Sequence, residues 1–331
     1  MARVLLLLPC PQDAPHGNVT TARRLARGLA RHKHEALLHP AAEAERAPQA
    51  ELVVALHARK AGPAAARLAA ERGLPHLVLF TGTDLNGRPN AAARAAVDAA
   101  AFCVCLGKAA AKRARELHGG EAGRYRLIRQ AAEPLPEPAS PALPEGCPEL
   151  GSEDQLVLVP GGVRAVKAPQ RALAALRPLA AQRPGLRLWF VGPELEASEG
   201  AALRAGLATA PWAAWIGPVP HDRLLPVFRR ADLVLSTSRS EGGPPNALLE
   251  AALATRTVLA SDIPAHREFP GHPHLFRDDA QLRRLVGGLL DQPGTRGLDA
   301  ARLRELVRTG FSVTAEAAAW ARAVSEALGG R

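Results

Sequence analysis

The sequence contains few sulphur-bearing and few aromatic residues. Its 331 residues include one methionine, one tyrosine and four cysteines, and aromatic residues make up 4% of the chain. This aromatic content is low for a platform that stacks the bases of single-stranded nucleic acid. Cys10, Cys103, Cys105 and Cys147 form no C-x-x-C pair, so neither a disulfide framework nor a zinc site is predicted.

Long hydrophobic runs are also absent. Hydrophobic residues make up 47% of the chain, yet no apolar run approaches the roughly 20 residues that a membrane span needs. The apolar stretch at residues 4–8 is shorter than the 7–15 residues typical of a signal peptide, so we interpret it as a buried strand. We therefore expect a cytoplasmic protein without a transmembrane segment.

Lysine and asparagine are scarce. The net charge is +10, but only five of the 42 basic residues are lysines, and the arginines are scattered without a basic run. This pattern indicates compositional drift more than nucleic-acid binding, and no nucleic-acid partner is expected. The four asparagines (Asn18, Asn86, Asn90 and Asn246) all fall in expected loops or helix starts.

Short apolar runs alternate with Ala/Arg-rich helical stretches through the first half of the chain. Such alternation predicts an α/β fold with a mostly parallel sheet covered by helices. The expected strands are 3–9, 35–39, 51–56, 76–81, 101–106 and 125–129, and the expected helices are 19–32, 62–73, 90–99 and 108–117.

Residues 132–154 hold six prolines without hydrophobic periodicity, which marks a linker, and the alternation then restarts. We expect Rossmann-like domains at 1–150, with this linker at its end, and at 151–310, followed by a helical segment at 311–331. Open parallel sheets bind ligands at the carboxyl ends of their strands, so a cleft between two such edges is predicted. Later strands are expected at 155–160, 186–191, 213–216, 232–236 and 256–260, and helices at 168–182, 198–207, 221–229, 246–254 and 311–328.

The most informative segment is Ser-Glu-Gly-Gly-Pro-Pro-Asn-Ala-Leu-Leu-Glu at 240–250. It joins an expected strand to an expected helix with Asn246 as its N-cap. A helix N-terminus suits a phosphate, and the flanking carboxylates of Glu241 and Glu250 suit hydroxyl groups. A ligand with a central phosphate and hydroxyls at both ends is a nucleotide sugar.

Arg164 and Lys167 follow another expected strand, in Gly-Gly-Val-Arg-Ala-Val-Lys at 161–167. A guanidinium fork and a compact ammonium group on one loop suit a diphosphate, although each residue alone is equally typical of a protein surface. Gly17 and Asn18, after the first strand, form a weaker candidate phosphate loop or an ordinary helix start.

Four further loops follow expected strands. His57 and Asp84 end neighbouring strands, where each could bind an acceptor or transfer a proton, or could be a structural histidine and a turn former. The loops with Gly192 and Val219 could hold a nucleobase through backbone groups, and His221 could cap the helix that follows. No metal-binding pattern, Walker A motif or G-x-S-x-G motif is present.

These motifs resemble the retaining GT-B glycosyltransferases of glycosyltransferase family 4, group 1. The resemblance rests on the loop 241–250, the Arg164 and Lys167 pair, and the two α/β halves. The segments 17–24, 55–58, 82–86, 166–167 and 191–194 resemble the group of glycosyltransferase 1 domain-containing protein 1, and several of them also resemble bacterial selenosugar synthases of selenoneine biosynthesis.

The resemblance implies a metal-independent hexosyltransferase that needs no cofactor and uses a nucleotide-sugar donor, UDP- or GDP-linked, with an unknown small-molecule acceptor. It implies that Arg164 and Lys167 bind the donor diphosphate, Glu241 contacts the transferred sugar and Glu250 binds the ribose. It further implies that backbone amides hold sugar and phosphate and that the C-terminal helix returns to the first domain. The backbone groups in question belong to Gly243, Asn246, Ala247 and Leu248.

One spacing departs from the family pattern. The family has two acids separated by seven residues, whereas eight residues separate Glu241 from Glu250. Counted back from Glu250, the first acid would fall on Gly242, and one added residue in the turn is the simplest account. This spacing motivates one alternative, a non-catalytic relative that binds sugar nucleotides. A second alternative comes from the resemblance to selenosugar synthases: an enzyme whose selenophosphate acceptor binds in a basic pocket around Arg23, Arg24 and Arg59.

Overall fold

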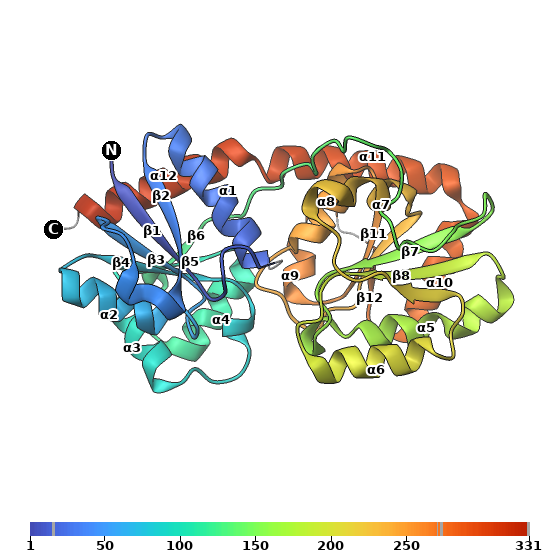
Figure 1. The fold of residues 1–331 in the computed structure, drawn as a ribbon, viewed down its shortest axis with the longest axis horizontal. Coiled ribbons are helices and arrows are strands. Elements are labelled where there is room, and N and C mark those ends of the chain that lie inside the picture. Colours follow the sequence, from blue (N-terminus) through green and yellow to red (C-terminus); the bar gives the residue numbers. More distant parts are fainter. Residues whose placement is uncertain (15–16, 270, 272–273, 330–331) are drawn as a thin grey trace. The chain divides into compact units, whose positions relative to one another are not determined.

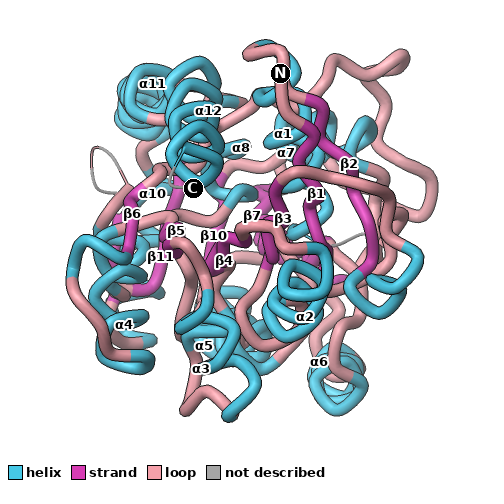
Figure 2. The backbone as a smooth tube through the Cα atoms, turned by 90° about the vertical axis from the view of Figure 1, so that its left-hand side faces the viewer, coloured by secondary structure: helices cyan, strands magenta, loops and turns pink. Residues whose placement is uncertain are grey.

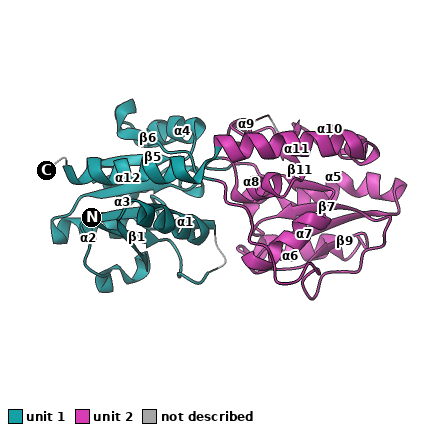
Figure 3. Ribbon diagram, turned by 90° about the horizontal axis from the view of Figure 1, so that it is seen from above, with its two compact units in different colours: residues 1–131, 241–243, 311–331 teal, residues 132–240, 244–310 magenta. Residues whose placement is uncertain are grey.

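The computed structural model describes residues 1–14, 17–269, 271 and 274–329, and the chain divides into two compact units (Figure 1). Figure 3 colours the first unit, residues 1–131, 241–243 and 311–331, teal and the second, residues 132–240 and 244–310, magenta. The boundary lies at Ala131–Ala132 instead of the expected residue 150. The proline-rich segment 132–154, which forms no helix or strand, therefore belongs to the second unit.

The first unit is built on a six-stranded parallel sheet in the order β2-β1-β3-β4-β5-β6. Alternate residues of β1 enter different apolar clusters, Val4 and Leu6 on one face and Leu5 and Leu7 on the other, as a strand buried on both faces requires. Figure 2 shows the strands between layers of helices. The strands are β1 (Arg3–Leu8), β2 (Glu35–Pro40), β3 (Leu52–Leu56), β4 (His76–Phe80), β5 (Phe102–Cys105) and β6 (Tyr125–Leu127).

Helices connect these strands, as parallel neighbours require. The side chain of Asn90 caps α3 by accepting a hydrogen bond from the backbone N–H of Ala93 at 2.8 Å. The helices of the unit are α1 (Gly17–Arg31), α2 (Gly62–Arg72), α3 (Ala91–Ala99), α4 (Lys108–His118) and α12 (Val313–Gly329), with 3₁₀ turns η1 (Ala41–Arg46), η2 (Thr83–Leu85) and η3 (Ala122–Arg124).

The C-terminal helix α12 packs on α1 within the first unit. A Cβ added at Gly28 of α1 would lie 3.2 Å from the Cβ of Ala317, so the absence of a side chain there allows the close approach. Beside this contact, Arg24 Nε donates to Glu316 at 2.7 Å, and both side chains are buried, with 3% and 4% exposure. A buried ion pair and a glycine contact thus hold the last helix against the first.

The second unit also has a six-stranded parallel sheet, in the order β12-β11-β10-β7-β8-β9. Its core contains alternate residues of β7 and β8 together with apolar faces of α5 and α10. The strands are β7 (Gln155–Pro160), β8 (Leu186–Val191), β9 (Ala213–Trp215), β10 (Leu233–Ser236), β11 (Thr257–Ser261) and β12 (His274–Phe276). The helices are α5 (Pro169–Gln182), α6 (Ala197–Leu207), α7 (Leu224–Arg230), α8 (Asn246–Leu253), α9 (Pro264–Arg267), α10 (Asp279–Asp291) and α11 (Pro293–Gly310), with 3₁₀ turns η4 (Ala165–Lys167) and η5 (His221–Arg223).

The predicted α/β fold with two parallel sheets is confirmed, and each of the expected strands is present. The helix expected from 19 begins at Gly17, and the one expected from 221 begins as a 3₁₀ turn, whereas α8 begins at Asn246 as expected. Asn246 is therefore not the N-cap. Pro245 holds that position with extended backbone (φ −64°, ψ 140°) and makes no side-chain cap.

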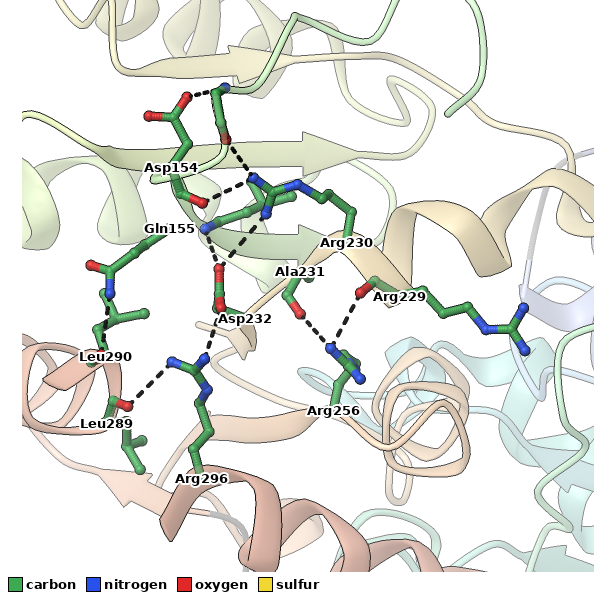
Figure 4. Close-up of polar contacts among 12 residues, drawn as sticks. Asp154, Gln155, Arg229, Arg230, Ala231, Asp232, Arg256, Leu289, Leu290 and Arg296 are labelled. Atoms are coloured by element: carbon green, nitrogen blue, oxygen red, sulfur yellow. Dashed lines mark hydrogen bonds and ion pairs between the residues drawn. The ribbon is translucent and has the colours of Figure 1, made fainter. Parts of the chain in front are cut away.

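The amino edge of the second sheet is held by charged side chains (Figure 4). Asp232, just before β10, accepts from the backbone N–H of Leu156 in β7 and from Arg296 of α11, each at 2.8 Å. Arg256 donates to the backbone carbonyls of Arg229 and Ala231 at the end of α7. This network joins two strands and two helices at the edge opposite the expected ligand site.

Candidate functional site

In the second unit, the candidate site begins with the loop after β7. Its backbone is joined to the loop after β8, because Val163 N–H donates to the carbonyl of Pro193 and Ala165 N–H donates to the carboxylate of Glu196, both at 2.8 Å. The same loop is held on its other side, where Arg239 N–H donates to the carbonyl of Val166 at 2.8 Å. The ends of β7, β8 and β10 are thereby joined into one framework.

Two glycines allow β7 and β8 to end side by side. Gly161 and Gly192 have φ angles of 135° and 146°, which L side chains rarely adopt. A Cβ on Gly192 would lie 2.3 Å from the carbonyl oxygen of Gly161, so the two backbones touch directly. The absence of a side chain at Gly192 is therefore explained by this contact within the protein, and binding of a nucleobase by the backbone of its loop stays a prediction.

Lys167 lines a small pocket at this edge of the sheet. The stem of Lys167 lies over Gly161, since a Cβ on that glycine would be 3.7 Å from Lys167 Cε. Thr237 fixes the backbone beneath, because its hydroxyl donates to the carbonyls of Lys167 and Ala168 at 3.0 and 2.9 Å. The pocket, called the β7 pocket below, is lined by Val159, Pro160, Gly161, Gly162, Val163, Lys167, Pro169, Phe190, Ser236, Thr237 and Ser238.

Arg164 precedes the 3₁₀ turn that carries Lys167. Its Nε is buried and donates no hydrogen bond to any residue that the structure describes. Leaving a buried donor without an acceptor costs about 1–3 kcal/mol, more for a charged group. The guanidinium is therefore suited to an anion supplied from outside the chain.

Glu250 lies one turn into α8, four residues after Asn246 and thus on the same helix face. Its carboxylate Oε1 pairs with His221 Nε2 at 3.1 Å, and the glutamate side chain is 12% exposed against 49% for the histidine. Val219 lies two residues before His221, in the loop that follows β9. From the sequence, His221 was expected only as a possible helix cap. Its contact with Glu250 joins residues 29 positions apart, and no local sequence pattern indicates such a contact.

Ala247 and Leu248 form the first turn of α8 together with Asn246. Leu248 is buried with 1% exposure, so it contributes apolar packing, and only its backbone could meet a ligand. The N-terminal turn of an eight-residue helix offers N–H groups and partial positive charge. The expectation that these backbone amides hold phosphate stays a prediction.

In the first unit, His57 is a buried residue at the end of β3. Its φ of 110° is unusual for a side-chain-bearing residue, and its side chain is 3% exposed. Nδ1 accepts from the backbone N–H groups of Arg59 and Lys60 at 3.2 Å each, so the neutral ring donates from Nε2 to the hydroxyl of Thr83 at 3.0 Å. Burial lowers the pKa of His57 below 6.5, although Asp84 opposes the shift.

Asp84 is 1% exposed, and backbone donors occupy its carboxylate. Oδ2 accepts from Ala58 N–H at 2.9 Å and Oδ1 accepts from Gly82 N–H at 2.8 Å, with Thr81 N–H within 3.3 Å of both. This geometry favours the structural alternative, in which Asp84 ties the ends of β3 and β4 together. A catalytic role for His57 or Asp84 stays a prediction.

The remaining first-unit candidates lie near α1. Gly17 is exposed at the start of α1, where an added Cβ would meet nothing within 4 Å, and Asn18 beside it is buried with 7% exposure. Pro15 and His16, in the same expected loop, lie outside the described residues. Gly17 therefore makes no close backbone contact with the described residues, and a phosphate-binding role for it stays a prediction.

The basic acceptor pocket expected from Arg23, Arg24 and Arg59 is wrong for Arg24. Its guanidinium is buried against Glu316 and serves the α1–α12 contact. Arg23 and Arg59 donate to the backbone carbonyls of Gln12 and Thr83, respectively. The three cations therefore donate to three different acceptors: Glu316, the carbonyl of Gln12 and the carbonyl of Thr83.

Glu241, Gly242 and Gly243 cluster with the first unit. A Cβ on Gly242 would lie 2.7 Å from the backbone N of Gly82, and one on Gly243 would lie 3.1 Å from the Cβ of Leu106. Position 242, where the family spacing would put the first acid, therefore has no room for a side chain in this conformation. The added residue in the turn leaves Glu241 as the acid of this loop.

Metal sites and membrane-spanning helices are two other features to consider in the described residues. No group of three or more His, Cys, Asp or Glu residues within them is arranged to hold a metal ion. None of the helices in the described ranges is long and apolar enough to cross a membrane.

Comparison with known proteins adds a family relationship for the second unit. Residues 154–291 match the family model described as Glycosyl transferases group 1. This segment contains the β7 pocket, His221 and α8. This match agrees with the resemblance to group 1 glycosyltransferases for this region, while the finer subgroup stays a prediction.

Solved structures agree on the fold over the whole chain. HepE of Anabaena in complex with UDP-glucose matches with a TM-score of 0.78 and 15% identity, over 98% of this chain and 100% of that one. Sucrose-phosphate synthase of Thermosynechococcus elongatus matches with a TM-score of 0.78 and 14% identity, over 100% of both chains. A glycosyltransferase of Rickettsia africae matches with a TM-score of 0.72 and 12% identity, over 98% of both chains. The chain thus shares its fold with these three proteins.

Proposed function

We propose that the chain is a retaining glycosyltransferase that moves a sugar from a nucleotide-sugar donor to an acceptor without a metal ion. The observation that carries this proposal is the β7 pocket, lined by Lys167 and lying within the segment that matches group 1 glycosyl transferases. The buried Nε of Arg164 supports it, because an anionic ligand would supply the acceptor that this donor lacks.

Each candidate residue of the second unit has a role in this proposal. Arg164 and Lys167 neutralise the donor diphosphate, and the first turn of α8 at Asn246–Leu248 adds backbone N–H groups. Glu250 accepts hydrogen bonds from the ribose hydroxyls, and Glu241 contacts the sugar. In the first unit, His57 and Asp84 shape the end of the sheet where we expect the acceptor.

In the reaction, the bond between the anomeric carbon and the diphosphate oxygen breaks, and its electron pair leaves with the diphosphate. A new bond forms from the anomeric carbon to the acceptor oxygen, whose proton passes to the departing phosphate. Fixed cations aimed at the developing negative charge lower the barrier, because they need no reorganisation at the moment of reaction. Orientation of donor and acceptor supplies a further large share.

The donor can be identified by a thermal-shift screen with UDP, GDP and ADP and with their glucose conjugates. A ligand that binds the native state raises its apparent stability, by about 2.7 kcal/mol at 100 times its Kd. UDP-glucose is the first choice, because HepE of similar fold was solved with it. Stabilisation by none of these compounds would refute the proposed donor class.

A non-catalytic sugar-nucleotide-binding protein is the competing hypothesis, motivated by the displacement of Glu241 in the lengthened turn. Calorimetric binding of the donor without release of nucleotide or transfer of sugar would favour it. For location we propose the cytoplasm, which the four free cysteines support, because reducing compartments keep thiols unpaired.

A further inference from the structure

His221 and Glu250 form a pair that no motif in the sequence indicated. His221 belongs to the 3₁₀ turn η5, and Glu250 belongs to α8. Their side chains meet at 3.1 Å, His221 Nε2 to Glu250 Oε1, although 29 residues separate them. The histidine side chain is half exposed, whereas the glutamate side chain is 12% exposed, so the histidine contacts a nearly buried carboxylate from its solvent-exposed side.

A carboxylate has more hydrogen-bonding capacity than one histidine uses. It offers two oxygens with about four lone-pair sites, and the imidazole occupies one of them. Among the residues that the structure describes, no hydrogen bond to Glu250 Oε2 is present. The carboxylate therefore keeps acceptor sites for the two hydroxyls of a ribose while its first oxygen is held in place.

Fixing the carboxylate matters because a glutamate side chain has three rotatable torsions. Ordering a rotamer-rich side chain at a binding site has an entropic cost, and a preformed contact removes that cost from binding. A neutral Nε2–H ring and an imidazolium both donate to Glu250, so the contact supports the ionised acceptor in either state.

We propose that His221 is a positioning residue that orients Glu250 toward the ribose hydroxyls of the nucleotide and thereby selects ribonucleotides over 2′-deoxyribonucleotides. The proposal rests on the proposed function, because it takes Glu250 as the ribose contact. His221 itself touches Glu250 and acts on the nucleotide through that side chain.

The experiment measures binding of nucleoside diphosphates by calorimetry. The probes are the diphosphate among UDP, GDP and ADP that binds the wild-type chain most tightly, and the 2′-deoxy form of that diphosphate. The variants are His221→Ala, which removes the donor, and His221→Gln, which keeps a side-chain N–H. The control is Asp222→Ala, which alters the neighbouring exposed residue of η5.

We expect His221→Ala to raise the Kd of the ribonucleotide about 5–10-fold and the Kd of the 2′-deoxy form less than about 2-fold, in line with the cost of ordering one glutamate side chain on binding. His221→Gln restores most of the discrimination, and Asp222→Ala stays within about 2-fold of wild type for both ligands.

Three results would overturn the inference while leaving the function in place. Equal weakening of both ligands by His221→Ala would show a loss of loop structure instead of lost orientation. An unchanged Kd would show that the contact has no effect, and tighter binding would show that His221 competes with the ribose. A wild-type chain that binds none of UDP, GDP and ADP would instead overturn the proposed function, and this inference with it.

Discussion

The two units use the polar side chains at the carboxyl ends of their sheets differently. In the first unit, Asp84 is occupied by backbone donors and His57 bonds to the loop that follows β4. In the second unit, backbone hydrogen bonds and two positive-φ glycines fix the loops, and Lys167 lines a pocket. The comparison indicates that the Asp84 carboxylate ties the first edge together, whereas mainly backbone hydrogen bonds tie the second, where the buried Nε of Arg164 has no acceptor among the described residues.

This difference has a physical reason. A buried carboxylate is stable only when hydrogen bonds replace its water, so Asp84 at 1% exposure has its partners inside the protein. A site for an anionic ligand needs the opposite arrangement, in which hydrogen-bond donors of the protein can bond to acceptor atoms of the ligand. The following substitutions test the distinction, because a structural group lowers stability and a binding group lowers activity.

The largest expected effect is on the first unit, at the buried pair of Arg24 and Glu316. Glu316→Ala leaves a buried guanidinium without its partner, and such a loss costs about 3–5 kcal/mol. Unfolding in urea measures the change. The control is Glu326→Ala, also on α12, whose partner Arg126 is half exposed, and it costs less than about 1 kcal/mol. Equal losses in the two variants would contradict a special role for the buried pair.

The second effect concerns activity alone. Lys167→Ala lowers sugar transfer about 10²–10³-fold, because removing one preorganised group that stabilises transition-state charge has that effect. The thermal midpoint stays near that of the wild type, since Lys167 lies at a pocket wall and the Thr237 contact uses its backbone. Lys112→Ala, an exposed lysine of α4, is the matched control and keeps full activity. Near-normal transfer by the Lys167 variant would refute the assignment of the donor site.

The third substitution decides between structure and chemistry at Asp84. Asp84→Ala leaves the N–H groups of Ala58 and Gly82 without their acceptor and costs about 2–3 kcal/mol in unfolding free energy. Asp84→Asn keeps one acceptor oxygen and loses less. If Asp84→Ala lowered transfer while its unfolding curve matched the wild type, the residue would belong to the chemistry, and the contrast between the two edges would fail.

Much of the fold could be predicted from local patterns. Continuous runs such as Leu52–Leu56 indicate strands buried on both faces, and the expected bounds agree with the observed ones within one or two residues at most positions. The segment from 262 to 310 was not assigned from the sequence. Its helix α10 could have been predicted, because Leu282, Val286 and Leu289 follow a helical period. By contrast, β12 spans only His274–Phe276, and α11 contains several glycines and no clear apolar stripe.

The candidate site was predictable only in part. Loops after strands are visible in the sequence, and therefore Lys167 and Glu250 could be singled out. Contacts between distant loops are not visible there: Thr237 beneath Lys167, His221 beside Glu250, and Glu316 on Arg24 each depend on tertiary packing. For Arg24 the error was physical, since a surface cation and the buried partner of a distant acid have the same local sequence signal.

The smallest expected effect is the response of the first unit to acid. Burial is the main cause of a lowered pKa at four histidines of that unit, His34, His57, His76 and His118. Below about pH 6.5 the unfolded chain binds protons that these folded residues do not yet bind, so the free energy of unfolding falls. The loss continues until the pH passes the lowered pKa values of the folded state.

Hydrogen exchange at pH 7.5 and 5.5, corrected for intrinsic rates, measures this response in peptides of β3 and β4. His76→Gln is the informative variant. His76 Nε2 contacts the carbonyl of Ala96 at 2.8 Å, and a glutamine amide can donate to the same oxygen without binding a proton. Its β4 peptides should therefore lose less protection at pH 5.5 than those of the wild type. The same loss in both proteins would show that acid acts on the first unit through groups other than this histidine.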